Sequence, residues 1–157
     1  MVSQNRPVGL LLAIRPAWID QIVAGKKTFE IRRRPPRVTA PLPALLYATA
    51  PISSVVAGCT ALRTVEGTTA SLWARCGESS LVTHDGFYRY LHGAPAPGAI
   101  ELGYVIEVPP TVLKWRPPQS WMWLREGVPS HEQLLELSKG APAPIRQRCS
   151  VPVDAHC

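Results

Sequence analysis

Clusters of proline limit where a helix or strand can run without interruption in this chain. Seventeen prolines are present in 157 residues. Proline lacks a backbone donor and fixes φ, so it favours connectors and the first turn of helices. The clusters fall at Pro35-Pro36, Pro41 to Pro43, Pro95 to Pro97, Pro109-Pro110, Pro117-Pro118 and Pro142 to Pro144. The chain is therefore predicted to fold as short elements joined by stiff connectors.

Hydrophobic patterning between these connectors predicts mostly strands, with a few inserted helices. We expect strands over residues 9–14, 28–32, 44–49, 54–62 and 98–108, the last kinked at Gly103 and extended over 112–115. We expect helices over 16–24, 68–76, 83–91 and 130–139, with Thr68 or Thr69 and Ser130 as N-caps. This order lacks a regular βαβ alternation, so we predict an α+β fold: a curved or barrel-like mixed sheet with helices at its ends.

The length and composition fit one domain with a tail. Hydrophobic residues make up 46% of the chain and charged residues 18%, which is typical of a folded core. We predict a domain over residues 1–139 and a mobile C-terminal tail over 140–157, where Ala, Pro, Arg, Gln and Ser dominate. The apolar run Val8 to Ile14 is too short for a signal peptide or a membrane span, so a cytoplasmic location is expected.

The four cysteines form no CxxC pair, which argues against a zinc ribbon. Cys59 and Cys76 are predicted to be reduced, partly buried thiols. Cys149, His156 and Cys157 are a weak metal candidate, since they lie in the Pro-rich tail. We predict no metal and no other cofactor.

The chain is basic, with a net charge of +6 and a pI near 9.5. A basic domain attracts polyanions, and nucleic acid is a common one, although a basic surface without a partner fits the charge equally well. The charge is densest over residues 26–37, where only Glu30 opposes six basic residues: Lys26, Lys27, Arg32, Arg33, Arg34 and Arg37. That density suits contact with phosphates.

Strand alternation places Glu30 and Arg32 on one face, about 7 Å apart, with Lys27 near the start of the strand. Such a cluster can bind charged groups or transfer protons. The same spacing also fits a structural ion pair on a solvated strand face. Glu101 leaves a similar choice open, because it can face a barrel lumen or pair with an arginine.

Gly25-x-Lys27-x-x-Glu30-x-Arg32 resembles the GxKxxExR signature of the ASCH domain family, within the PUA-like superfamily. The resemblance spans roughly residues 8–124. It includes Leu12 to Pro16 followed by Trp18, Leu46 to Thr49, Ile100-Glu101 and Pro117 to Ser120. It implies a small PUA-like mixed β-barrel with flanking helices, and a cleft lined by the signature.

The resemblance also implies a function in binding RNA or another nucleic acid. Some members of the family are enzymes: one bacterial branch hydrolyses N4-acetylcytidine, and another member is a ribonuclease. In the amidohydrolase branch the functional residues are a lysine, a threonine and a glutamate. These match Lys27, Glu30 and Glu78, so Glu30 replaces the threonine here and removes that hydroxyl.

We therefore predict a protein that binds nucleic acid, RNA in particular, or a nucleotide in a cleft lined by Lys27, Glu30 and Arg32. The alternative is a metal-independent hydrolase of a modified nucleoside or of RNA, in which the candidate catalytic residues are Lys27, Glu30 and Glu78. The candidate nucleic-acid-binding residues are Arg15, Lys26, Arg32, Arg33, Arg34, Arg37, Tyr47 and Trp121. A third hypothesis is a protein-interaction module that uses residues 121–124. No membrane partner is expected.

Overall fold

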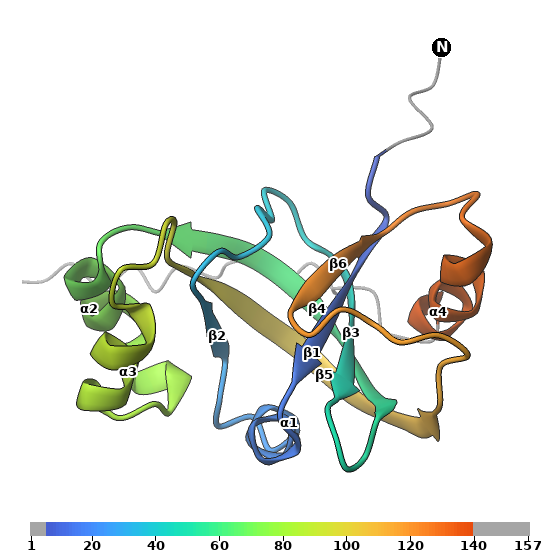
Figure 1. Ribbon diagram of the computed structural model, residues 1–157, viewed down its shortest axis with the longest axis horizontal. Helices are drawn as coiled ribbons and strands as arrows, with labels where there is room; N and C mark the ends of the chain where they lie inside the picture. The colour runs from blue at the N-terminus through green and yellow to red at the C-terminus, as the bar shows by residue number, and fades with distance from the viewer. Residues whose placement is uncertain (1–5, 140–157) are drawn as a thin grey trace, which may run out of the picture.

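The computed structural model describes residues 6–139 as a curled six-stranded sheet with four helices around it (Figure 1). The strands are β1 (Gly9–Ile14), β2 (Phe29–Arg32), β3 (Leu42–Ala48), β4 (Ser54–Glu66), β5 (Gly98–Thr111) and β6 (Trp121–Leu124). The helices are α1 (Pro16–Val23), α2 (Thr69–Ser80), α3 (His84–Leu91) and α4 (Pro129–Lys139). The predicted α+β class is confirmed.

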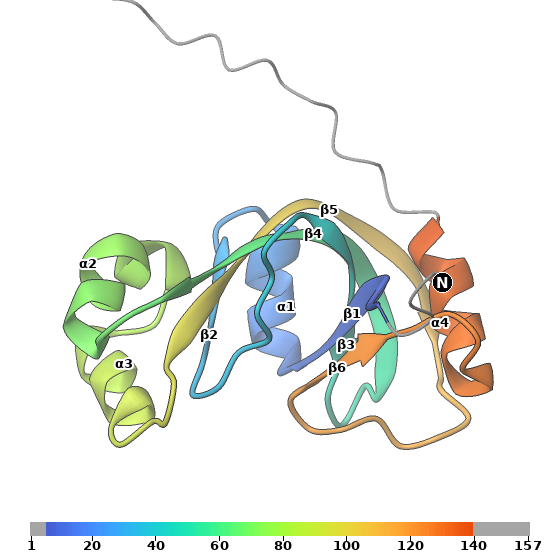
Figure 2. The ribbon, with the colours of Figure 1, turned by 90° about the horizontal axis from the view of Figure 1, so that it is seen from above.

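The sheet has the order β2-β5-β4-β3-β1-β6. Strands β1 and β3 are parallel, and the other pairs are antiparallel. The long strands β4 and β5 bend into an arch that separates β2 from β1, β3 and β6 (Figure 2). The predicted barrel-like mixed sheet is therefore present as a half-barrel with two edge strands, β2 and β6.

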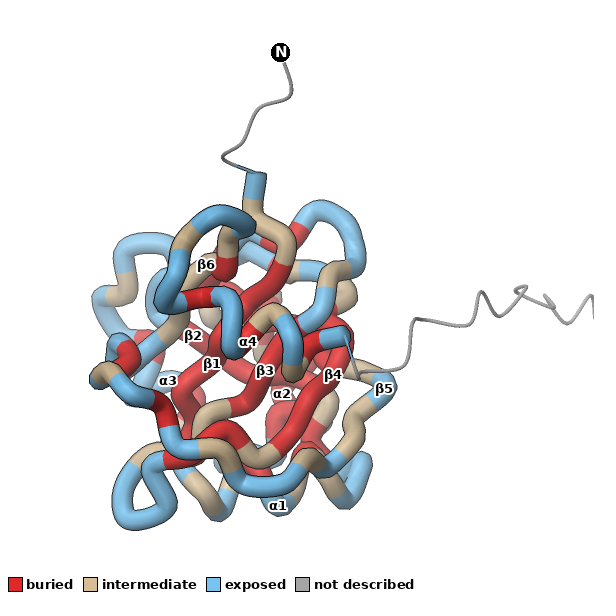
Figure 3. The backbone as a smooth tube through the Cα atoms, turned by 90° about the vertical axis from the view of Figure 1, so that its right-hand side faces the viewer, coloured by how far each residue is buried: buried red, intermediate tan, exposed pale blue. Residues whose placement is uncertain are grey.

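Strand β1 is buried along its whole length, as its continuous apolar run predicted. Leu10 and Leu12 pack into the central core, together with residues of α1 and β3. Leu11 points the other way, into a second cluster with Leu134 of α4. Figure 3 shows the resulting buried centre, in which β1, β3 and β4 run side by side. Strand β1 is thus fixed in the middle of the domain.

Three of the four helices in residues 6–139 cover the ends of the sheet, whereas α1 packs against β5 and β3 beneath the arch (Figure 2). Helices α2 and α3 lie together beside β2, and α4 packs against β3 and β6 at the opposite side (Figure 1). The side chains of Thr68 and Thr83 cap α2 and α3 by accepting from the backbone N–H of Ser71 and Gly86, each at 3.1 Å. Both caps match the residue type that helix N-termini favour, and Thr68 was one of the two predicted.

Several predicted boundaries were wrong, among them the end of β4, which runs to Glu66 rather than to residue 62. Helix α2 continues to Ser80, so Glu78 is helical rather than part of a loop. Strand β5 ends at Thr111, and residues 112–115 do not extend the sheet. Helix α4 begins at Pro129, so Ser130 lies in its first turn instead of capping it. The start of α4 has a local cause, because proline favours the first turn of a helix.

The kink predicted at Gly103 is confirmed as a β-bulge. Thr60 pairs with Gly103 while Gly58 pairs with Ile106, so β5 carries one extra residue there. Tyr104, directly after Gly103, adopts a left-handed backbone conformation with φ of 53°. Bulges of this kind bend a strand and increase its twist, which is what the arch of β5 requires.

Side chains bridge the two edge strands. Trp121 at the start of β6 donates from its indole Nε1 to the carbonyl of Arg34, at 2.9 Å. Arg32 at the end of β2 donates from Nη1 to the Ser120 hydroxyl, at 3.3 Å. We call the gap between the edge strands β2 and β6 the seam. These side-chain contacts bridge it, although the two strands do not pair.

Within residues 6–139, Cys59 and Cys76 are buried free thiols, as predicted. No helix in that range is long and apolar enough to cross a membrane. The predicted tail over 140–157, with Cys149, His156 and Cys157, lies outside the described residues.

Candidate functional site

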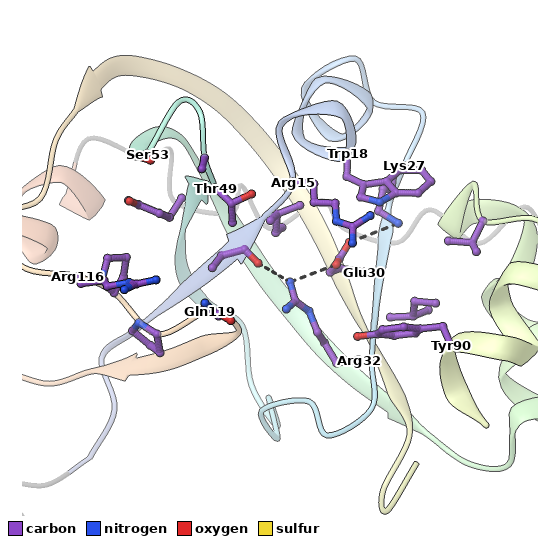
Figure 4. A pocket seen from close by; sticks show the side chains of 18 residues that line it. Arg15, Trp18, Lys27, Glu30, Arg32, Thr49, Ser53, Tyr90, Arg116 and Gln119 are labelled. Carbon is purple, nitrogen blue, oxygen red and sulfur yellow. Dashed lines mark hydrogen bonds and ion pairs between the residues drawn. The ribbon is translucent and has the colours of Figure 1, made fainter. Parts of the chain in front are cut away.

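A pocket of about 640 Å³ opens beside the seam (Figure 4). It is lined by the junction of β1 and α1, by β2, by the turn after β3, by parts of the α2–α3 region, and by residues 116–119. Its size falls within the roughly 300–1,000 Å³ of small-molecule sites. The signature residues Lys27, Glu30 and Arg32 all line it, so the structure brings them together.

Lys27 is placed by the turn that follows α1. Gly25 adopts φ of +74°, a left-handed conformation that favours glycine, and the backbone N–H of Lys27 donates to Gln21 at 3.0 Å. The side chain then runs inward, and its Nζ donates to the carbonyl of Ser80 at 2.6 Å. Ser80 ends α2, where carbonyl groups carry partial negative charge and stabilise a cation.

Glu30 lies between two cations. Its Oε2 is 3.4 Å from Lys27 Nζ, and its Oε1 is 3.2 Å from Arg32 Nη2. Arg32 Nη2 also donates to the carbonyl of Ala13, at 2.8 Å. The ion pairs of the alternative hypothesis are therefore present. The solvated face that it assumed is wrong, because Glu30 and Arg32 are each 8% exposed and Lys27 is 2% exposed.

Burial is the main influence on the pKa of Lys27. Loss of water lowers this pKa, the Glu30 carboxylate raises it, and the Arg32 guanidinium lowers it further, with a net shift below the usual value of 10.5. The ammonium also lies 4.7 Å from the centre of the Trp18 ring. Because Ser80, Glu30 and Trp18 surround Nζ, Lys27 is placed to hold Glu30 in position rather than to reach a ligand.

Two arginines stand at the exposed parts of the pocket, Arg15 and Arg116. Neither side chain makes a hydrogen bond or an ion pair with another of residues 6–139. Hydroxyl groups of Thr49, Ser53 and Tyr90 line the same space, and Figure 4 places Thr49 and Ser53 toward the Arg116 end. The exposed cations can bind an anion, and the hydroxyls can add hydrogen bonds.

Of the predicted binding residues, Arg15, Arg32 and Tyr47 line the pocket. The charged segment also contains Lys26, Arg33, Arg34 and Arg37, and these four do not line the pocket. Arg33 donates to the carbonyls of Tyr90 and His92, at 2.7 and 2.8 Å, and so caps the end of α3. Arg37 pairs with Glu66, and the side chains of Lys26 and Arg34 are exposed outside the lining.

Glu78 and Trp121 also lie outside the pocket lining. Glu78 is exposed near the end of α2. Trp121 is half-buried against the core and donates to Arg34, and its segment 121–124 forms β6. Glu101 pairs with Arg63, which decides its open choice in favour of a structural pair.

Sequence reasoning missed Thr49, Ser53, Tyr90, Arg116 and Gln119 as lining residues. They come from loops and from α3, and no periodic pattern marks such positions. Arg116 had one available signal, its place directly before the Pro117-Pro118 pair that the family resemblance included. No group of three His, Cys, Asp or Glu side chains that could hold a metal ion occurs among residues 6–139.

The family model of the ASCH domain matches residues 12–109. The chain belongs to the ASCH domain family. The match begins in β1 and ends in β5, so it contains the whole Gly25 to Arg32 signature. The predicted resemblance is therefore confirmed.

Several similar proteins come from Zymomonas mobilis. A protein named ASCH domain-containing ribonuclease is 32% identical over an alignment 129 residues long, which covers 74% of this chain and 84% of that protein. The crystal structure of an ASCH protein from the same organism is 28% identical and superimposes with a TM-score of 0.72, covering 83% of this chain and 96% of the other. A mutant of that protein superimposes with a TM-score of 0.73 at 27% identity, covering 85% of this chain and 99% of the mutant protein.

Proposed function

We propose that this ASCH domain binds single-stranded RNA, with one nucleotide in the pocket beside the seam. The observation that carries the proposal is the buried Lys27–Glu30–Arg32 cluster at the base of a pocket whose exposed arginines, Arg15 and Arg116, have no side-chain partner within residues 6–139. Unpaired bases enter pockets of this size, and arginine binds phosphate through paired N–H groups.

Charge around the pocket supports an anionic ligand. Four cationic side chains line it, those of Arg15, Lys27, Arg32 and Arg116, against one carboxylate, that of Glu30. The relative named as a ribonuclease supports RNA as the polyanion. Nucleotide binding of this kind releases counterions, so affinity is expected to fall steeply as salt rises.

A titration of labelled single-stranded RNA at two ionic strengths tests this function. We expect RNA to bind at low salt, and the logarithm of the binding constant to fall linearly with the logarithm of the salt concentration. Arg15→Gln is expected to weaken binding, while Lys26→Gln, which lies nearby outside the pocket, is the matched control. Absence of binding at low salt would remove the proposal.

Cleavage of RNA is a second candidate function, favoured by Glu30 and by the name of the relative. A 2′-hydroxyl that attacks the adjacent phosphorus must lose its proton, and a carboxylate within the pocket can accept it. The P–O5′ bond then breaks to give a 2′,3′-cyclic phosphate, and the leaving 5′-oxygen takes a proton from water. Arginines such as Arg15 or Arg32 stabilise the negative charge on the non-bridging phosphoryl oxygens.

This candidate is tested with RNA and with DNA of the same sequence, the two labelled alike. Only RNA should be cut, because DNA lacks the 2′-hydroxyl. Glu30→Gln, purified in parallel, should abolish the products and also reveals any contaminating nuclease. Equal cleavage by this variant would exclude Glu30 as the base, while leaving RNA binding to its own test.

A further inference from the structure

The pocket carries different chemistry at its two ends (Figure 4). One end holds the Glu30 carboxylate beside Arg15, Trp18 and Tyr90, and the other holds the Arg116 guanidinium beside Thr49 and Ser53. A nucleotide has matching polarity, with an anionic phosphate at one end and N–H groups on its base at the other. The arrangement of the pocket thus carries information about the orientation of a ligand.

The Glu30 end is built to accept hydrogen bonds. The carboxylate lies between the Lys27 ammonium and the Arg32 guanidinium. Each cation also donates to a backbone carbonyl, Lys27 to that of Ser80 and Arg32 to that of Ala13. Each carboxylate oxygen has more than one lone pair, so Glu30 can still accept from a ligand. Base edges of unpaired nucleotides present such donors.

Arg32 adds a donor beside this acceptor. Its Nε is buried and has no hydrogen-bond partner among the described residues. A buried donor without a partner costs free energy, and because this Nε has almost no exposed surface, a ligand acceptor reaches it only when neighbouring side chains move. The edge of a nucleobase carries donors and acceptors side by side, which fits Glu30 and Arg32 together.

The Arg116 end is held in place from both sides. The indole of Trp115 donates to the carbonyl of Ser130 at 3.2 Å, and Trp121 donates to Arg34. Pro117 is buried directly after Arg116, and proline restricts the backbone between these anchors. The exposed Arg116 guanidinium is therefore presented by a stiff segment, which reduces the entropy lost when it binds a phosphate.

We infer that the pocket binds a nucleotide in one orientation, with the base edge on Glu30 and the phosphate on Arg116. This inference rests on the proposed function and adds two separable sites to it. Arg116 supplies affinity that is independent of sequence, whereas Glu30 supplies preference among bases, because a carboxylate can only accept hydrogen bonds.

The test uses the full chain and labelled RNA hexamers of uridine with a single A, C, G or U at a central position. Arg116→Gln should weaken binding of all four RNAs about equally, by about tenfold. It should also reduce the magnitude of the slope of log binding constant against log salt by about 0.7. Their order of affinity should not change. Arg75→Gln, an exposed arginine of α2 outside the pocket lining, is the matched control and should leave both readouts unchanged.

Glu30→Gln should have the complementary effect. A carboxamide donates as well as accepts, so the order of the four RNAs should change while the salt slope does not fall. A circular dichroism melt shows whether each variant is folded. A variant that does not fold is replaced by Arg116→Lys, which keeps the charge and loses the paired contact, or by Glu30→Asp, which shortens the reach.

The possible results separate the two proposals. The orientation is overturned, while RNA binding stands, if the wild-type protein binds the hexamers and either variant fails to show its effect. For Arg116→Gln this means the same affinity and salt slope as Arg75→Gln, and for Glu30→Gln the same order of affinity for the four RNAs as the wild type. If the wild-type protein binds no hexamer at low salt, RNA binding and the orientation fail together.

Discussion

The Lys27 ammonium, 2% exposed, lies 3.4 Å from the Glu30 carboxylate and holds it at the base of the pocket. The neighbouring Lys26 is exposed and outside the lining. Two adjacent lysines thus have opposite surroundings, which makes them a natural pair for experiment.

Lys27→Met is expected to destabilise the fold by about 3–5 kcal/mol, because it leaves a buried carboxylate with one partner fewer. Lys26→Met is expected to change the free energy of unfolding by less than about 0.5 kcal/mol. Urea denaturation of both variants measures the difference. Equal midpoints would contradict the structural role assigned to Lys27.

The lowered pKa of Lys27 predicts a pH dependence of stability. Between this pKa and the unfolded value of 10.5, the unfolded chain binds more protons at Lys27 than the folded chain does. Below that pH range, burial of the charged ammonium reduces the free energy of unfolding by its full amount. This cost disappears as pH rises through the range, because Lys27 loses its proton. The unfolding free energy of the wild type relative to Lys27→Met should therefore increase with pH there.

The buried thiols affect the same range with the opposite sign. Burial raises the pKa of Cys59 to about 12 and also raises that of Cys76. Their contribution to stability falls as pH rises above 9, where the unfolded thiols ionise. The contribution of Cys59 cancels in the difference between the wild type and Lys27→Met, because only burial shifts its pKa. That of Cys76 cancels in part, because the Lys27 ammonium lowers the pKa of Cys76 in the wild type alone. A relative stability that is flat or falling with pH would contradict the prediction for Lys27.

Reactivity of the thiols gives an independent prediction. Only the thiolate reacts with iodoacetamide, and burial disfavours the thiolate at Cys59 and Cys76. At pH 8 the native protein should be alkylated at these positions far more slowly than the protein in urea. Peptide mapping by mass spectrometry follows each cysteine separately. Native labelling at the unfolded rate would show that these cysteines are accessible.

The successive arginines Arg33 and Arg34 are expected to differ as well. Arg33 binds two carbonyls at the end of α3, so Arg33→Ala should lower stability by about 1 kcal/mol. Arg34 contributes its backbone carbonyl to Trp121, which an alanine retains, so Arg34→Ala should be close to neutral. Thermal unfolding compares the two, and a larger loss for Arg34→Ala would reverse the assignment.

The sequence predicted the parts of the site that lie close together along the chain. Strand alternation placed Glu30 and Arg32 on one face, and Phe29 and Ile31 indeed pack on the other, against α2 and α3. The contact of Lys27 with Ser80 could not be predicted, because it requires α2 to run farther than its composition indicated. Arg116 was missed for a similar reason, since only the pairing of β6 with β1 brings its segment beside β2.

The bridge between β2 and β6 has a consequence for synthesis on the ribosome. Arg15, Lys27, Glu30 and Arg32 emerge early, but the wall that contains Arg116 and the bridging residues Ser120 and Trp121 emerges near the end. A nascent chain that stops before this segment has an unclosed seam and half a pocket. Contacts between such distant parts of a chain form slowly. Competence for a ligand is therefore acquired only once nearly all of the domain has been translated.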